Sequence, residues 1–425
     1  MQKMRKMKDS GIEWIGEIPE GWGVGQIGQL YSERRTKVSD KDYPPLSVTM
    51  KGILPQLSTA VKTDAHDDRK LVCKGDFAIN SRSDRRGSCG ISEQDGSISL
   101  INTVLQPRGE MNPGYYNWLF HTSMFADEFY KWGHGIVDDL WTTGWSDMKK
   151  IGVPVPSKCE QKQLAEHLNF ECSNIDALLS KTRSSIEEYK KLKQAVITQA
   201  ITKGVRGERE MKDSGVEWIG KIPREWDVTK IGRIGQTSSG ATPLRSKETS
   251  FFDDATIRWV RTLDLNDGLV YDSSEKITEL ALSMSACSIM PTGTVCVAMY
   301  GGAGTIGKCG LLMTPCATNQ AVCSIICNSN VILPKFLLNQ LLALKPYWMK
   351  YAVGTRKDPN ISQDIVARMK VLIPPLSEQK EIVDYLDAKC AEIDGLIAKK
   401  EHLVKELESY KKSLIYEVVT GKREV

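Results

Sequence analysis

Two long segments of the chain, residues 158–203 and 377–420, place apolar side chains at alternating intervals of four and three positions. This spacing lays one apolar stripe along a helix, which can then pack against a partner helix. Both segments are rich in Lys, Glu, Gln, Leu and Ala, and the only Gly or Pro in either of them is Gly395. The pattern therefore predicts two long helices.

The apolar stripe keeps its register when the first helix is shifted onto the second by an offset of 218 (393 − 175). We expect the two helices to pack on each other as an antiparallel coiled coil; the alternative is that each packs on its own domain. Polar residues such as Lys193 and Lys411 interrupt the stripe and are of the kind that sets register at some cost in stability. The predicted seam residues are Leu168, Ile175, Leu179, Ile186, Tyr189, Val196, Leu386, Ile393, Ile397, Val404, Leu407 and Leu414.

Residues 25–152 and 229–370 have a different pattern, in which short β-like runs alternate with turns rich in Gly, Pro and Asp. In each stretch a glycine opens one run, at Gly75 and at Gly293, and the offset between these glycines is again 218 (293 − 75). A polar loop, a second run and a helix that begins at a proline follow in both. We interpret the two stretches as diverged copies of one α+β domain.

A short segment is repeated almost letter for letter before each domain. Met7–Val24 reads MKDSGIEWIGEIPEGWGV and Met211–Val228 reads MKDSGVEWIGKIPREWDV, with an offset of 204 (211 − 7). The difference of 14 between the two offsets (218 − 204) predicts a larger second domain. The expected organisation is a lead at 1–24, an α+β domain at 25–152, a helix segment at 153–210, a second lead at 211–228, a second α+β domain at 229–370 and a second helix segment at 371–425.

Composition narrows the class of protein without fixing it. A hydrophobic content of 41%, a charged content of 26% and a net charge of +4 fit a globular protein, and they permit nucleic-acid binding without requiring it. The 11 cysteines contain no CxxC pair and several lie in apolar runs, which indicates buried thiols in a reducing compartment. No run approaches 18 apolar residues and no secretory signal is visible, so we expect a cytoplasmic protein.

No segment matches a catalytic or metal-binding motif well. Gly302–Cys309 nearly spells a phosphate-binding P-loop, but Cys309 replaces the Ser or Thr and Gly310–Pro315 cannot form the helix that must follow. Asn112–Tyr115 lacks the second proline of the NPPY motif of amino-methyltransferases. HExxH and GxSxG are both missing from the sequence. We therefore expect no catalytic residues and no metal site in this chain.

Polar and basic loops are the better candidates for function. Residues 81–88 place three arginines in one turn, residues 300–308 form the corresponding loop of the second domain, and residues 354–357 form another basic loop. Arginine can pair with guanine through two hydrogen bonds, while lysine holds phosphates. The alternative is a solvated surface loop. The DNA-binding candidates are Arg82, Ser83, Arg85, Arg86, Ser88, Tyr300, Thr305, Lys308, Asn319, Arg356 and Lys357.

The repeated lead, the EQK segments after Pro156 and Pro375, the IDAL and IDGL segments, and the closing ITKG and VTGK resemble the specificity (S) subunit of Type I restriction-modification systems. The resemblance covers the whole chain. It implies a non-catalytic subunit in which each α+β domain is a target recognition domain that reads one half of a bipartite, asymmetric DNA site. It also implies that the helices pair as a coiled coil, set the spacing and dock partner subunits.

The resemblance further implies the partners and cofactors. The partners would be double-stranded DNA, two modification (M) subunits that carry S-adenosylmethionine and methylate adenine, and restriction (R) subunits that use ATP and Mg²⁺; this chain would bind no cofactor itself. The alternative is a duplicated protein–protein interaction scaffold whose contact with DNA is incidental. Steep loss of DNA affinity with rising salt would distinguish a DNA reader from such a scaffold.

Overall fold

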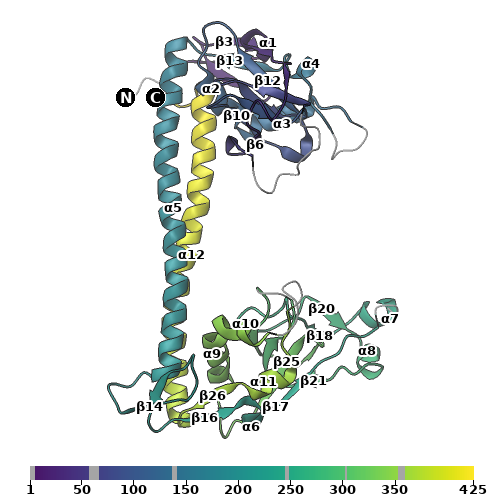
Figure 1. The fold of residues 1–425 in the computed structure, drawn as a ribbon, viewed down its shortest axis with the longest axis vertical. Helices are drawn as coiled ribbons and strands as arrows, with labels where there is room; N and C mark the ends of the chain where they lie inside the picture. Colours follow the sequence, from purple (N-terminus) through teal and green to yellow (C-terminus); the bar gives the residue numbers. More distant parts are fainter. Residues whose placement is uncertain (1–4, 57–66, 136–140, 245–247, 302–303, 353–358) are drawn as a thin grey trace. The chain divides into compact units, whose positions relative to one another are not determined.

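The computed structural model describes residues 5–56, 67–135, 141–244, 248–301, 304–352 and 359–425. The chain divides into two compact units: unit 1 contains residues 1–183 and 402–425, and unit 2 contains residues 184–401. Each unit combines a β-rich part with portions of two long helices, α5 (Lys158–Lys203) and α12 (Leu376–Val419), which lie side by side (Figure 1). The predicted class, α+β with two β-rich domains and two long packed helices, is confirmed, and the domain bounds stay a prediction.

Unit 1 is built around a four-stranded sheet in the order β10-β9-β12-β4. Aromatic side chains from β4, β9, α2 and α3 fill its core; the rings of Phe77 and Phe120, for example, are 5.1 Å apart. Its elements are β1 Met7–Asp9, β2 Glu17–Pro19, β3 Gly23–Gln26, α1 Ile27–Leu30, β4 Tyr31–Glu33, β5 Lys37–Val38, β6 Leu46–Thr49, β7 Gly52–Pro55, β8 Arg69–Val72, β9 Phe77–Asn80, η1 Ser83–Arg85, β10 Cys89–Ile91, β11 Gly96–Ile98, β12 Asn102–Pro107, α2 Pro113–Phe120, α3 Ser123–Lys131, α4 Trp145–Met148 and β13 Gly152–Val155.

Unit 2 repeats this sheet, in the order β17-β25-β22-β23, and adds β19 at one edge. Its elements are β14 Met211–Asp213, β15 Lys221–Pro223, β16 Asp227–Lys230, α6 Ile231–Ile234, β17 Gly235–Ser239, α7 Glu248–Phe252, β18 Ile257–Val260, β19 Gly268–Val270, β20 Glu275–Ile277, α8 Glu279–Ser283, β21 Ile289–Met290, β22 Val295–Ala298, β23 Cys309–Leu312, β24 Cys316–Thr318, β25 Val322–Cys327, α9 Pro334–Leu344, η4 Lys345–Tyr347, α10 Trp348–Tyr351, α11 Gln363–Arg368 and β26 Lys370–Ile373.

The structure places the size difference between the two β-rich parts in one stretch. The offset between the first positions of β4 and β17 is 204 (235 − 31), whereas the offset between those of β9 and β22 is 218 (295 − 77). The increase of 14 (218 − 204) therefore arises between β17 and β22, where α7, β18, β19, β20, α8 and β21 are found. The elements that surround this stretch keep their equivalents in unit 1.

The two long helices run antiparallel within each unit. In unit 1 Lys411 of α12 pairs with Asp176 of α5 at 2.6 Å, and in unit 2 Lys193 of α5 pairs with Asp394 of α12 at 2.7 Å. An offset of 218 relates the two lysines (411 − 193) and also the two aspartates (394 − 176), so the same ion pair is formed twice with the helices exchanged. Helix α12 continues through Gly395 without a break. Among the described residues no helix has the length and apolarity needed to cross a membrane.

Candidate nucleic-acid interface

Two loops occupy equivalent positions in the two β-rich parts. Residues 81–88 connect β9 to β10 in unit 1, and residues 299–308 connect β22 to β23 in unit 2. Each loop is held by an isolated bridge, Arg82 to Thr142 in the first and Tyr300 to Asn360 in the second. The bridged residues are again related by the offset of 218 (300 − 82 and 360 − 142). The same position in the duplicated sheet therefore holds loops with different side chains in the two units.

The first loop presents arginines to solvent. Arg82, Arg85 and Arg86 are exposed, and Arg85 and Arg86 keep about half or more of their side-chain surface, at 69% and 55%. Arg85 lies 3.7 Å from Asp84 within the same turn, and Ser83 is half-buried. Ser88 is 6% exposed, and its carbonyl accepts a hydrogen bond from the Asn80 N–H, so Ser88 holds the base of the loop rather than facing outward.

The second loop contains few charges and lies closer to the core. Tyr300 is 44% exposed, whereas Thr305 and Lys308 are half-buried. Asn319 is half-buried and its side-chain oxygen accepts a hydrogen bond from the Ala321 N–H at 3.1 Å, which closes a turn. Arg356 and Lys357 lie outside the described residues. After Lys308 the chain forms strand β23 in place of the helix that a P-loop requires.

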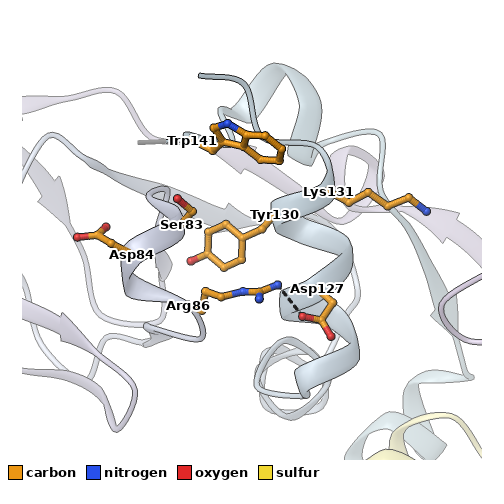
Figure 2. A pocket seen from close by; sticks show the side chains of 7 residues that line it. All are labelled: Ser83, Asp84, Arg86, Asp127, Tyr130, Lys131 and Trp141. Atoms are coloured by element: carbon orange, nitrogen blue, oxygen red, sulfur yellow. Dashed lines mark hydrogen bonds and ion pairs between the residues drawn. The ribbon is translucent and has the colours of Figure 1, made fainter. Parts of the chain in front are cut away.

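A cleft of about 500 Å³ opens beside the first loop (Figure 2). Helix α3 supplies one wall, and Trp141 lies on the far side of the cleft from Arg86 in this view. The sequence had pointed to the arginines of the loop but not to the residues of α3 that meet them. The cleft is lined by Ser83, Asp84, Arg86, Asp127, Tyr130, Lys131 and Trp141.

In each unit a glutamate at the start of a long helix forms hydrogen bonds with the lead. The sequence showed these glutamates only as part of the repeated EQK segments. Glu160 accepts hydrogen bonds from Arg5 and from the Trp22 indole, the latter at 3.2 Å. Burial raises the pKa of Glu160, but hydrogen bonds from Arg5, Trp22 and Ser157 outweigh it and lower this pKa below its ordinary value. Ser157 and Glu160 also form a capping box at the start of α5, in which each side chain accepts a hydrogen bond from the other residue's backbone N–H.

In unit 2 the corresponding glutamate, Glu378, is more deeply buried. The Glu378 side chain has no exposed surface, and it accepts hydrogen bonds from Arg209 and, at 3.0 Å, from the Trp226 indole. The guanidinium of Arg209 also lies over the Trp226 ring, 5.2 Å from its centroid. Pro375 stands where unit 1 has Ser157 (375 − 157 = 218), so no serine hydroxyl is available to share this carboxylate.

The glutamine that follows each glutamate fixes the start of a helix in the β-rich part. The Gln161 amide donates to the Pro156 carbonyl and its oxygen accepts from the Asn112 N–H, just before α2. Gln379 makes the corresponding bonds to the Pro374 carbonyl and the Leu333 N–H, just before α9. The EQ pair therefore joins the lead, the long helix and the β-rich part of each unit through hydrogen bonds.

The predicted seam residues differ in how far they are buried, and their role as a seam stays a prediction. The members with less than a tenth of their surface exposed are Leu168, Ile175, Leu179, Ile186, Leu386, Ile393 and Leu414. The members that are half-buried are Tyr189, Val196, Ile397, Val404 and Leu407.

The described residues contain no group of three or more His, Cys, Asp or Glu side chains placed to hold a metal ion. Burial raises the pKa of the Cys296 and Cys323 thiols to about 12, as expected for small apolar side chains inside a core.

Comparison with known proteins places this fold in a family. Residues 223–406 match the model of the Type I restriction modification DNA specificity domain. The chain is 25% identical over 425 residues to the specificity subunit of type I restriction enzyme MjaVIII from Methanocaldococcus jannaschii, covering 95% of this chain and 93% of that protein. It is 23% identical to the EcoR124I/EcoR124II specificity subunit from Escherichia coli, over 64% of this chain and 61% of that protein.

Two solved structures share the fold. One, described as the structural basis of complex assembly and conformational transition of the type I R-M system, has a TM-score of 0.74 at 12% identity and covers 95% of this chain and 98% of its own. The other, the HsdS subunit from Thermoanaerobacter tengcongensis, has a TM-score of 0.52 at 14% identity and covers 96% and 98%. The chain belongs to the family of Type I restriction-modification specificity subunits. It is the DNA specificity subunit of such a system and is itself non-catalytic.

Proposed function

We propose that each β-rich part of this chain reads one half of a bipartite, asymmetric site in double-stranded DNA. The observation that supports this division of labour is the pair of equivalent loops at 81–88 and 299–308. The same bridges hold both loops in a duplicated frame, while the loops themselves differ in charge, length and burial. Two β-rich parts with the same frame and different loops are suited to recognising two different DNA sequences.

In this proposal residues 25–152 and 229–370 are the two target recognition domains. The contacts with DNA come from Arg82, Ser83, Arg85 and Arg86 in the first, and from Tyr300, Thr305, Lys308 and Asn319 in the second, together with Arg356 and Lys357. The exposed arginines of the first loop are suited to base edges and phosphates. The second loop, with an exposed tyrosine and half-buried polar groups, is suited to a different half-site.

The long helices have a second role in the proposal. They set the spacing between the half-sites and dock two modification subunits, which bring S-adenosylmethionine and methylate adenine. Restriction subunits add ATP- and Mg²⁺-dependent translocation and cleavage. Two observations on this chain support a spacing role: a seam of apolar residues in constant register, and the two equivalent Lys–Asp pairs that align the helices.

An exchange of one domain tests the division of labour. Residues 25–152 are replaced by the corresponding segment of a relative with a different known target, and the methylated motif is read by single-molecule sequencing. We expect one half of the motif to change while the other half and the spacing stay constant. The reciprocal exchange of residues 229–370 is the matched control and should change only the other half. A change of both halves in either chimera would contradict the proposal.

Salt titration separates this function from that of a protein–protein scaffold. A reader that contacts several phosphates releases counterions, so its affinity for DNA falls steeply as salt rises. The assembled complex should show this slope on its target duplex and a large preference over a scrambled duplex. A shallow slope with equal affinity for both duplexes would favour the scaffold.

A further inference from the structure

Arg86 is held from two sides in the cleft of unit 1. Its Nη2 donates a hydrogen bond to the Asp127 carboxylate at 2.6 Å, and its guanidinium lies over the Tyr130 ring, 5.3 Å from the centroid (Figure 2). Tyr130 is itself fixed, since it is 5% exposed and its hydroxyl donates to the Asn80 carbonyl at 3.3 Å. Arg86 is therefore positioned by Tyr130, which is itself bonded to the last residue of strand β9 in the core sheet.

This arrangement orients the Arg86 guanidinium but leaves some of its hydrogen-bond donors free. Among the described residues Arg86 has one side-chain hydrogen bond, from Nη2 to Asp127. Nη2 carries a second N–H, and this N–H together with Nη1 or Nε leaves one two-donor edge of the guanidinium available to an incoming acceptor pair. The side chain is still 55% exposed. An exposed ion pair adds little stability by itself, but a planar fork that is already oriented loses less entropy when it binds. The side chain of the neighbouring Arg85 lies 3.7 Å from Asp84 of its own turn.

The second unit lacks this arrangement at the equivalent place. Residues 299–308 contain no arginine, so the second loop has no counterpart of Arg86. Trp348 is fully buried and lies against Gly307 of the second loop, where an added Cβ would come within 2.0 Å of the indole. An aromatic residue supports the loop in both units, but only the first presents a buttressed arginine.

We propose that Arg86 reads a guanine in the half-site bound by the first recognition domain, with Asp127 and Tyr130 as its positioning residues. The guanidinium fork matches the O6 and N7 acceptors that guanine presents in the major groove. Because the fork is anchored at Nη2, its direction is set before DNA arrives. The inference rests on the proposed function, and it narrows that function to one side chain and one base pair.

Variants of the positioning residue give the first test. In the native complex, Asp127→Asn removes the charge that anchors Arg86 and leaves the arginine in place. We expect the methylated motif to keep its second half and its spacing, while one guanine position of the first half becomes degenerate. Arg86→Lys, which keeps the charge but loses the fork, should relax the same position. Arg224→Lys is the matched control, because Arg224 forms an exposed ion pair with Glu210 outside both recognition domains, and it should leave the motif unchanged.

Modified DNA gives a test that needs no variant. The wild-type complex is bound to duplexes in which 7-deazaguanine, which lacks the N7 acceptor, replaces each guanine of the first half-site in turn. We expect one replacement to weaken binding by roughly 5- to 150-fold, the usual range for losing a paired base contact. In the Asp127→Asn and Arg86→Lys complexes that replacement should have little effect.

Three results would overturn the proposal. One is a wild-type complex that tolerates 7-deazaguanine at every position of the first half-site. Another is an unchanged motif in both Arg86→Lys and Asp127→Asn. The third is loss of all methylation in both variants while the complex still assembles, because Arg86 would then support binding in general. Failure of the proposed function is a separate result, seen when removal of the whole chain leaves methylation unaltered.

Discussion

The variant Glu378→Ala is expected to destabilise unit 2 by about 3–5 kcal/mol, the range measured when one partner of a buried ion pair is removed. The reason is that the buried Trp226 indole would lose its acceptor, while Arg209, only 14% exposed, would lose its buried carboxylate and keep only Glu225 and the Lys203 carbonyl. The equivalent change in unit 1, Glu160→Ala, should cost about 1–2 kcal/mol. Glu160 and Arg5 each keep 30% of their side-chain surface, so water can replace the lost bonds.

Amide hydrogen exchange on the assembled complex measures the destabilisation of unit 1 and of unit 2 separately. It reports local opening of the backbone and does not require one global unfolding transition. Peptides from residues 205–228 should lose protection in Glu378→Ala, and those from residues 5–26 should lose less in Glu160→Ala. Glu378→Gln is the control, since it keeps an acceptor for Trp226 and removes only the charge; its effect should be intermediate. Equal losses in the two alanine variants would contradict the burial argument.

A heptad inserted into α5 alone, after Ser184, is expected to abolish specific methylation. The Lys411–Asp176 pair of unit 1 and the Lys193–Asp394 pair of unit 2 lie on opposite sides of that point along both helices. Lengthening only one helix by a heptad therefore forces one of the two pairings, and the apolar seam beside it, to slip or to break. Methylation of the native motif by the variant complex is the measurement.

Insertion of the same heptad into both helices, after Ser184 and after Glu401, is the matched control. Both ion pairs and both halves of the seam are then preserved. A heptad adds about 10 Å of helix, and base pairs are spaced by about 3.4 Å, so the methylated motif should keep both half-sites and gain about three base pairs of spacer. A double variant that methylates the native spacing would show that the helices do not set it.

The long helices could be predicted in detail because their signal is local and periodic. A seam residue such as Leu168 is marked by its neighbours three and four positions away, and the repeat at Leu386 confirms the register. The duplicated β-rich frame was predictable for a related reason, since Gly75 and Gly293 keep the offset of the helices. Regular spacing and repetition can both be read from a single chain.

The cleft of unit 1 could not be predicted in the same way. Arg86 and Asp127 are 41 residues apart in sequence and meet only because α3 packs beside the loop that follows β9. Glu160 and Trp22 are separated by 138 residues, so the EQK motif was visible while its partners were not. Side-chain contacts across elements depend on tertiary packing, which leaves no periodic mark in the sequence.

We propose that this chain determines which DNA sequence its complex methylates. The direct measurement is the adenine methylome of the native host with and without the gene, read by single-molecule sequencing. We expect one bipartite, asymmetric adenine motif to disappear when the gene is deleted and to return when it is restored. An adenine methylome that is identical in the two strains, in a host whose modification subunits are expressed, would contradict it.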